Sequence, residues 1–311
     1  MQNSSFDKSI QVDRNHAVQV DLTAVLVAAG GGNPLVLTIG DAASLPSGPL
    51  ESSHRSLQAG LRDWVEQQTG RPLGYIEQLY TFADRDRGTD EPGHRVISIS
   101  YLGLTHEEQP HATTSGSWRS WYEFFPWEDH RYGAPQLIAD LIEPALQRWT
   151  GIGEFEEKRL RRAAIAFGLQ GQPWNEELIL QRYELLYEAG LVEEAARRSS
   201  PSRAHLVPGR VMQGDNRRIL ATGIARLRTK IKYRPVVFEL MPPAFTLLQL
   251  QRAVEALAGV TVHKQNFRRL IEQQDLVEET GQMSSDTGGR PAKLFRFRHA
   301  VLDERPLAGT K

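Results

Sequence analysis

The sequence contains no cysteine among its 311 residues. This absence excludes disulfide frameworks, thiolate metal sites and cysteine nucleophiles. No stretch approaches the roughly 18 consecutive apolar residues that indicate a membrane-spanning helix. The first ten residues are polar and lack the apolar core of a signal peptide. We therefore expect a cytoplasmic protein with no membrane partner.

The chain also has almost no net charge, with 37 basic and 38 acidic residues. The two signs are unevenly distributed along it. Residues 201–311 hold 19 basic and 10 acidic side chains, which leaves 18 basic and 28 acidic in residues 1–200. A basic segment of this kind is typical of a part that binds nucleic acid. At about 150 residues per domain, the length also favours two units.

The N-terminal part combines strand patterns with helix patterns. Two apolar runs, over 17–28 and 35–39, flank a glycine-rich turn and predict a β-hairpin. Apolar residues at helical spacing predict a helix over 55–68, which Gly70 and Pro72 end. The other predicted elements are strands at 75–82, 95–104 and 118–125 and a helix over 137–149. This order predicts an α+β fold with helices packed on a mixed sheet.

The middle of the chain is helical and resembles an insertion, over about residues 152–206. It contains predicted helices at 158–169 and, after an Asn175 cap, at 178–198. The next helix has one apolar stripe. Its basic residues, which we interpret as a solvated face, are Arg217, Arg218, Arg226, Arg228, Lys230 and Lys232.

The last unit carries the clearest local signals. Thr246 and Gln249 form the pattern of a capping box, and Gly259 ends the helix that follows. A second helix turns Phe267 and Ile271 inward, and a hairpin over 276–298 completes the unit. Helix, helix and hairpin in this order predict a winged helix-turn-helix.

Residues 45–70 resemble a Nudix box, in which a glycine-rich turn leads into a helix whose glutamates hold magnesium on a nucleoside diphosphate. The box places glutamates where this chain has Arg55, Trp64, Gln67 and Gln68. A neutral glutamine is a poor replacement for a carboxylate ligand of Mg²⁺. The resemblance therefore implies a Nudix-like domain with no catalytic residue and no metal site.

The segment after the box is similar to ADP-ribose-type Nudix domains over residues 77–102. In such domains the arginines of the first loop face the phosphates. The resemblance implies a ligand site formed by Tyr80, Phe82, Arg85 and Arg87. An aromatic cluster over 118–127 is an alternative place for an adenine, although aromatic residues at strand ends more often belong to the core.

The C-terminal segments 217–233, 245–247, 266–269 and 289–297 together resemble the NrtR-type family of Nudix-related transcriptional regulators. The length and the helical insertion resemble its longer branch, the NadQ-type repressors of NAD biosynthesis. The resemblance implies a homodimer with a Nudix-like sensing domain over 12–234 and a winged helix over 235–300. It also implies operator DNA as partner, no required cofactor, and NAD, ADP-ribose or ATP as effector.

The residue types of the last unit suit this role. Arginine reads guanine and asparagine reads adenine in the major groove, and basic residues on a wing suit phosphates. The predicted DNA-binding residues are Lys264, Asn266, Arg268, Arg269, Arg290 and Lys293. Two alternatives remain at this point, an active Nudix hydrolase and an RNA-binding regulator.

Overall fold

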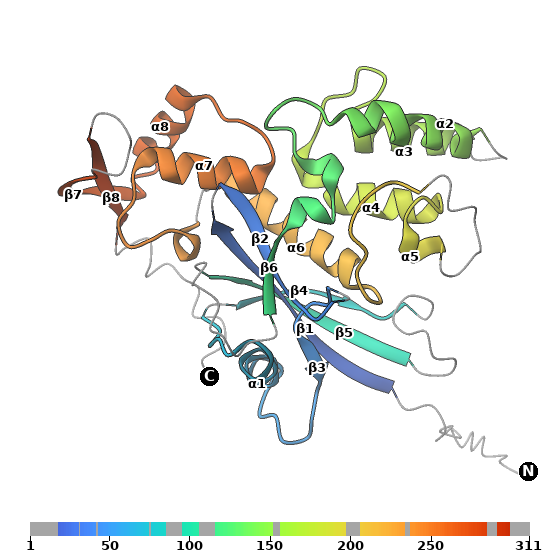
Figure 1. Cartoon of the computed structure of the whole chain (residues 1–311), viewed down its shortest axis with the longest axis horizontal. Coiled ribbons are helices and arrows are strands. Elements are labelled where there is room, and N and C mark those ends of the chain that lie inside the picture. Colours follow the sequence, from blue (N-terminus) through green and yellow to red (C-terminus); the bar gives the residue numbers. More distant parts are fainter. Residues whose placement is uncertain are drawn as a thin grey trace, which may run out of the picture.

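The structure is a computed structural model of the whole chain (Figure 1). The residues that it describes are 18–30, 32–41, 43–74, 76–84, 95–105, 116–151, 156–196, 206–233, 237–284 and 291–298. Among these, no helix is long and apolar enough to cross a membrane.

A six-stranded mixed sheet forms the N-terminal part, with β1 as its central strand. Its strands are β1 (Val18–Gly30), β2 (Asn33–Ile39), β3 (Ser47–Pro49), β4 (Ile76–Phe82), β5 (Arg95–Leu104) and β6 (Gly116–Ser120). The order is β4-β5-β1-β2-β6, with β3 also paired to β1. Strands β1 and β5 run parallel and the other pairs antiparallel. The predicted α+β class is confirmed.

Both faces of this sheet are covered, and β1 shows why. Alternate side chains of a strand point to opposite faces, so Leu22 and Leu26 enter one core and Val25 and Val27 another. Helix α1 (Leu57–Thr69) covers the first face, and α6 (Asn216–Tyr233) lies across the second (Figure 1). The Ser56 side chain caps α1 by accepting from the backbone N–H of Ala59.

Two of the predicted elements differ from the structure. Strand β6 ends at Ser120, whose side chain caps a 3₁₀ helix (Trp121–Glu123), and a second 3₁₀ helix (Pro126–Glu128) follows. The predicted strand over 118–125 is therefore wrong beyond Ser120. The helix predicted over 178–198 is also interrupted, because Gly190 turns the chain with a φ of 70°.

The helical middle of the chain consists of short segments. They are a π-helical turn (Ile138–Ile142), α2 (Glu143–Thr150), α3 (Glu156–Phe167), a 3₁₀ helix (Glu176–Leu178), α4 (Ile179–Glu188) and α5 (Glu193–Ala196). The Asn175 side chain caps the 3₁₀ helix, as predicted. Helices α3 to α5 fall inside the predicted insertion, whose limits stay a prediction.

The C-terminal unit has the predicted order of elements. After a 3₁₀ helix (Phe238–Leu240) come α7 (Leu247–Ala258), α8 (Lys264–Gln273), β7 (Val277–Ser284) and β8 (Ala292–Phe297). The capping box of Thr246 and Gln249 is present, and Gly259 ends α7 with a φ of 75°. Phe245 pairs by its backbone with Phe295 of β8, which ties the wing to the start of α7.

Two of the basic residues of α6 do not lie on a solvated face, which corrects the sequence interpretation for them. Arg217 and Arg228 are each only 1% exposed. Arg217 pairs with Glu194 at 3.1 Å. Arg228 shares the fully buried carboxylate of Glu128 with Arg182, whose Nη2 lies 2.9 Å from Oε2.

The other four basic residues of α6 also face acidic partners from the first 200 residues. Arg218 pairs with Asp84 at 2.6 Å, and Lys232 with Glu177 at 2.5 Å. Arg226 and Lys230 both bind Glu77 of β4. Much of the C-terminal positive charge therefore compensates the acidic N-terminal part, and the basic residues that remain unpaired become the informative ones.

The C-terminal end of α7 is docked on the rest of the molecule. The last turn of a helix leaves its carbonyls without helical partners. Here Tyr122 Oη donates to the carbonyl of Ala256 at 2.7 Å, Arg228 Nε to that of Leu257 at 3.0 Å, and the backbone N–H of His130 to that of Gly259 at 2.7 Å. A Cβ at Gly259 would lie 2.4 Å from the carbonyl of Glu128, so this close approach requires glycine.

Replacing the buried carboxylate tests the role of this network. Glu128→Gln leaves Arg182 and Arg228 without a counter-charge, and breaking such a buried pair costs about 3–5 kcal/mol. The free energy of unfolding in urea at pH 7 should fall by that amount. The matched control is Glu188→Gln, since Glu188 is 45% exposed in its pair with Arg162 and an exposed pair contributes about 0–1 kcal/mol.

The same variant has a defined pH dependence. Burial raises the pKa of Glu128, but the two arginines outweigh it and hold the pKa below its ordinary value of 4.5. Because its pKa is lower in the folded state, the ionised Glu128 stabilises the fold at pH values above 4.5. This stabilisation is lost as the pH falls through the pKa that Glu128 has in the folded state. The stability difference between wild type and Glu128→Gln should therefore shrink in acid. A difference that stays constant, or one below 1 kcal/mol at pH 7, would contradict the assigned role.

Candidate functional site

The outer face of α8 carries a cluster of polar side chains. Phe267 and Ile271 are buried and fix the orientation of the helix. This turns Lys264, Asn266, Arg268 and Arg269 outward, and all four are exposed. Among the described residues, the three basic side chains of this cluster have no ion pair. We call these four residues the α8 surface. The structure thus brings together four of the six residues predicted to bind DNA.

The basic side chains of the wing differ from those of the α8 surface because they form ion pairs. Lys293 is exposed but binds Glu279 of the opposite strand at 2.7 Å. Arg296 similarly binds Glu278, and Arg298 binds Asp275, each at 2.8 Å. Arg290 lies outside the described residues. The sequence shows these charges but not that they are paired across the hairpin.

The predicted ligand loop is described only in part, because Arg85 and Arg87 lie outside the described residues. Phe82 is 6% exposed and packs under the Arg218 guanidinium, 5.0 Å from its ring centre. Tyr80 is 59% exposed and meets the Phe82 ring edge-on at 5.0 Å. Tyr80 is therefore accessible to a ligand, whereas the Phe82 ring belongs to the core.

The helix of the segment that resembles a Nudix box makes packing contacts at two positions where the box has glutamates. The Trp64 indole donates to the carbonyl of Pro49 at 2.8 Å and covers Gly48. The Gln68 amide bonds to both backbone groups of Ser47, at 2.8 and 3.1 Å. The described residues contain no cluster of three potential metal-ligating side chains. These residues do not fit a magnesium ion, which needs several oxygen ligands including carboxylates.

The aromatic cluster over 118–127, the alternative ligand site, is mainly core. Trp121, Phe124, Phe125 and Trp127 are each fully buried. The Phe125 and Trp127 rings each lie 5.4 Å from the Arg217 guanidinium, and the Trp121 ring lies 5.9 Å from that of Arg228. The cluster therefore offers no ring for stacking an adenine at these four positions.

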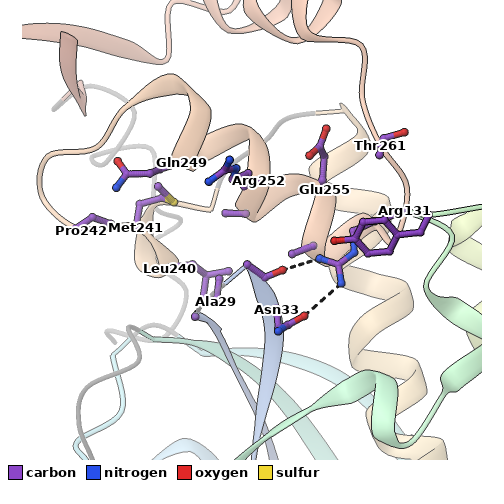
Figure 2. Close-up of a pocket in the computed structure, with 15 residues that line it drawn as sticks. Ala29, Asn33, Arg131, Leu240, Met241, Pro242, Gln249, Arg252, Glu255 and Thr261 are labelled. Atoms are coloured by element: carbon purple, nitrogen blue, oxygen red, sulfur yellow. Dashed lines mark hydrogen bonds between the residues drawn. The ribbon is translucent and has the colours of Figure 1, made fainter. Parts of the chain in front are cut away.

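A groove lies where the tip of the β1–β2 hairpin faces α7 (Figure 2). It has a volume of about 760 Å³, within the about 300–1,000 Å³ of small-molecule sites. We call it the junction groove. The hairpin contributes Gly30 and Asn33, and α7 contributes Gln249, Arg252 and Glu255. Arg131 and Tyr132 close one side. No sequence pattern predicts this groove, because its walls come from segments that are far apart in the chain.

Comparison with known protein families and proteins assigns the C-terminal unit. Residues 237–297 match the family model "NrtR DNA-binding winged helix domain". The ADPR responsive transcriptional repressor NtrR of Acinetobacter baylyi is 42% identical over 83 residues. That match covers 27% of this chain and 33% of the repressor, so the chain spans about a third of that relative.

Solved structures show the same overall fold. Shewanella oneidensis NrtR in complex with a 27mer DNA has a TM-score of 0.54 at 18% identity, covering 91% of this chain and 95% of that one. A MutT/nudix family protein from Enterococcus faecalis has a TM-score of 0.53 at 17% identity, covering 91% and 87%. The expected resemblance to the NrtR-type, Nudix-related regulators is confirmed, and so is the winged helix.

The packing of Trp64 in the box gives a stability prediction. A Cβ at Gly48 would lie 2.3 Å from the Trp64 ring, which hydrogen-bonds to Pro49 and cannot easily retreat. Gly48→Ala should lower the free energy of unfolding by about 1–3 kcal/mol, as expected for overpacking. The control is Gly74→Ala, where nothing lies within 4 Å of the added methyl group. Equal free energies of unfolding for the two variants would show that Trp64 does not pack tightly against Gly48.

Proposed function

We propose that this chain, which ends in an NrtR-type winged helix domain, is a ligand-responsive transcriptional repressor that binds operator DNA as a homodimer. The α8 surface is the observation that carries the proposal. It is the exposed face of the second helix of a winged helix-turn-helix, and its basic residues have no ion pair among the described residues. The second helix of this motif is the one that enters the major groove.

The chemistry of the α8 surface supports sequence recognition. Arg268 and Arg269 can each fork to O6 and N7 of a guanine, and Asn266 to N6 and N7 of an adenine. Lys264 suits a phosphate at the start of the helix. The wing would add phosphate contacts through Lys293 and Arg290. The Lys293 pair with Glu279 is exposed, so it can be exchanged for a phosphate at little cost.

The proposed effector is an adenine nucleotide, with ADP-ribose ahead of NAD and ATP. The printed name of the Acinetobacter relative describes a repressor that responds to ADP-ribose. We place the effector at the loop after β4, next to the exposed Tyr80, with Arg85 and Arg87 on its phosphates. The helices α3 to α5 support the assignment to the longer, NadQ-type branch, whose targets are NAD biosynthesis genes.

We also propose that the Nudix-like domain binds its nucleotide effector without hydrolysing it. Trp64 and Gln68 occupy positions of the box where the family has metal-binding glutamates, and both side chains are engaged in hydrogen bonds to the backbone. The domain keeps the sheet and helix that shape a nucleotide site and lacks the carboxylates of a diphosphate hydrolase.

Operator binding can be tested by two classes of variant. Arg268→Ala or Arg269→Ala should cost about 1–3 kcal/mol and relax the preference at one base pair. Lys293→Ala should weaken specific and random duplexes alike and reduce the salt slope by about one unit. Arg226→Ala, which removes an exposed arginine of α6, is the control and should leave affinity unchanged. The measurement is fluorescence anisotropy with an operator selected from random duplexes, with RNA of the same sequence as competitor.

Two results of that experiment would contradict the proposal. If Arg226→Ala weakens binding as much as Arg268→Ala and Arg269→Ala do, the interaction is nonspecific. If RNA competes better than duplex DNA, the partner is RNA.

The effector site can be tested by calorimetry with ADP-ribose. Arg85→Ala combined with Arg87→Ala should weaken binding by on the order of 1.5–3 kcal/mol, as expected when charge-assisted hydrogen bonds are lost. Arg148→Ala, an exposed arginine of α2, is the matched control. An unchanged dissociation constant in the double variant would show that the loop is not the site.

The absence of hydrolysis is tested directly. The purified chain should release no AMP from ADP-ribose in the presence of Mg²⁺ beyond a protein-free blank, because the box lacks metal carboxylates. Glu66, an exposed glutamate on α1, provides the control. Magnesium-dependent release of AMP that Glu66→Gln abolishes would establish the chain as an active hydrolase.

A further inference from the structure

The junction groove lies at the opposite end of the sheet from the proposed effector loop. Strands β1 and β5 are parallel, with Val18 opposite Arg95 and Val27 opposite Leu104. The described end of β4, at Phe82, pairs with Ser98 and so lies level with Asp21 near the start of β1. The groove lies at the end of β1, at Ala29 and Gly30. At about 3.3 Å per residue, most of the length of β1 separates the two places.

Two of the charged side chains that line the groove, Arg252 and Glu255, have no ion pair among the described residues. Arg131 is committed to Asp129, at 2.8 Å, and to the carbonyl of Gly32 and the side chain of Asn33 at the hairpin tip. The Glu255 carboxylate accepts from Gln251 and from the backbone of Val262. The Arg252 guanidinium is exposed on the groove side of α7 and has no partner among the described residues (Figure 2).

A second hydrogen-bond donor lies beside Arg252. Residues three apart on a helix share a face, so Gln249 lines the same wall. Its Oε1 accepts from the backbone of Thr246 in the capping box, which fixes the side chain and turns its amide nitrogen toward other acceptors. Arginine together with an amide donor suits a phosphate group.

The groove also offers an aromatic ring and an apolar floor. Tyr132 is 91% exposed, far more than any other large apolar side chain described here. The apolar residues Met241, Ala253 and Ala256 also line the groove. A tyrosine ring held at the rim of such a floor is suited to stacking on a planar base.

We propose that the junction groove is a second ligand site, which binds a phosphorylated aromatic molecule of the size of a nucleoside monophosphate. Arg252 and Gln249 hold its phosphate, and Tyr132 stacks on its ring. The walls come from both the sheet and the winged helix, so an occupied groove favours one placement of α7 relative to the hairpin. The proposal that the groove binds this ligand depends only on these contacts. The effect of the ligand on DNA affinity rests on the proposed function.

Calorimetry with AMP as the probe tests the two halves of the site. Adenosine lacks the phosphate and ribose 5-phosphate lacks the base, so each should bind at least about tenfold more weakly than AMP. Binding of adenosine as tight as that of AMP would remove the role of Arg252. Binding of ribose 5-phosphate as tight as that of AMP would remove the role of Tyr132.

Matched variants locate the binding. Arg252→Gln should weaken AMP binding about tenfold, whereas Arg269→Gln, on the neighbouring helix, should not. Ala253→Leu, which fills the groove, should abolish AMP binding. Ala258→Leu lies on the same helix at the same 8% exposure but outside the groove and should retain it. Thermal unfolding of each variant shows that the fold is kept.

The outcomes separate this proposal from the proposed function. If AMP binding survives Arg252→Gln and Ala253→Leu but is lost when Arg85 and Arg87 are both replaced by Ala, the groove is not a site and the effector loop stands. If AMP does not bind at all, the groove proposal fails while ADP-ribose binding at the loop is untouched. Loss of AMP binding in Arg252→Gln, with ADP-ribose binding retained, supports two separate sites.

Discussion

The carboxylate of Glu128 is the interaction on which the arrangement of the molecule depends. It is fully buried and lies between Arg182 of α4 and Arg228 of α6. A buried charge is tolerated only when it is paired and hydrogen-bonded. The buried charge of Arg182 is hydrogen-bonded beyond its pair with Glu128, because its guanidinium also donates to the carbonyls of Ala166 and Asn175. It lies 3.8 Å over the Trp174 ring. Helices α4 and α6 are thereby joined through one carboxylate.

The same network reaches the DNA-binding unit. Arg228 donates to the last turn of α7, beside Tyr122 and the backbone of His130, so three separate donors from outside the winged helix hold the carbonyl end of one helix. Positive charge at a helix C-terminus is also favourable to the helix dipole. The winged helix is therefore docked on α6 and on the segment that contains Tyr122 and His130. A ligand that alters this contact, from the groove or from the far loop, can alter the placement of the α8 surface.

Local sequence signals predicted most of the fold. The capping box at Thr246, the glycine stops at Gly70 and Gly259, and the apolar run of β1 are each local features of a few residues, so they can be predicted from the sequence. The break at Gly190 was missed because an isolated glycine does not always end a helix. The strand predicted beyond Ser120 failed because aromatic residues are equally at home in the buried 3₁₀ turns found there.

The role of the charged residues was the property hardest to predict from the sequence. An excess of basic residues after residue 200 predicted a nucleic-acid partner, yet every basic residue of α6 named above has an acidic partner from the N-terminal part. Ion pairs between residues more than 20 positions apart cannot be inferred from one sequence. The α8 surface was predicted correctly as exposed, because Phe267 and Ile271 fix its orientation locally. The junction groove could be recognised only from the three-dimensional fold, which brings its distant segments together.

The central claim is that one chain couples nucleotide binding to operator binding. The direct test is the anisotropy-measured affinity of the full chain for a selected operator at fixed salt, with and without saturating ADP-ribose. The account predicts binding to the duplex and a change in affinity of about fivefold or more, the usual range of coupling between two sites. Operator affinity that is identical with and without bound ADP-ribose, or no duplex binding at low salt, would contradict it.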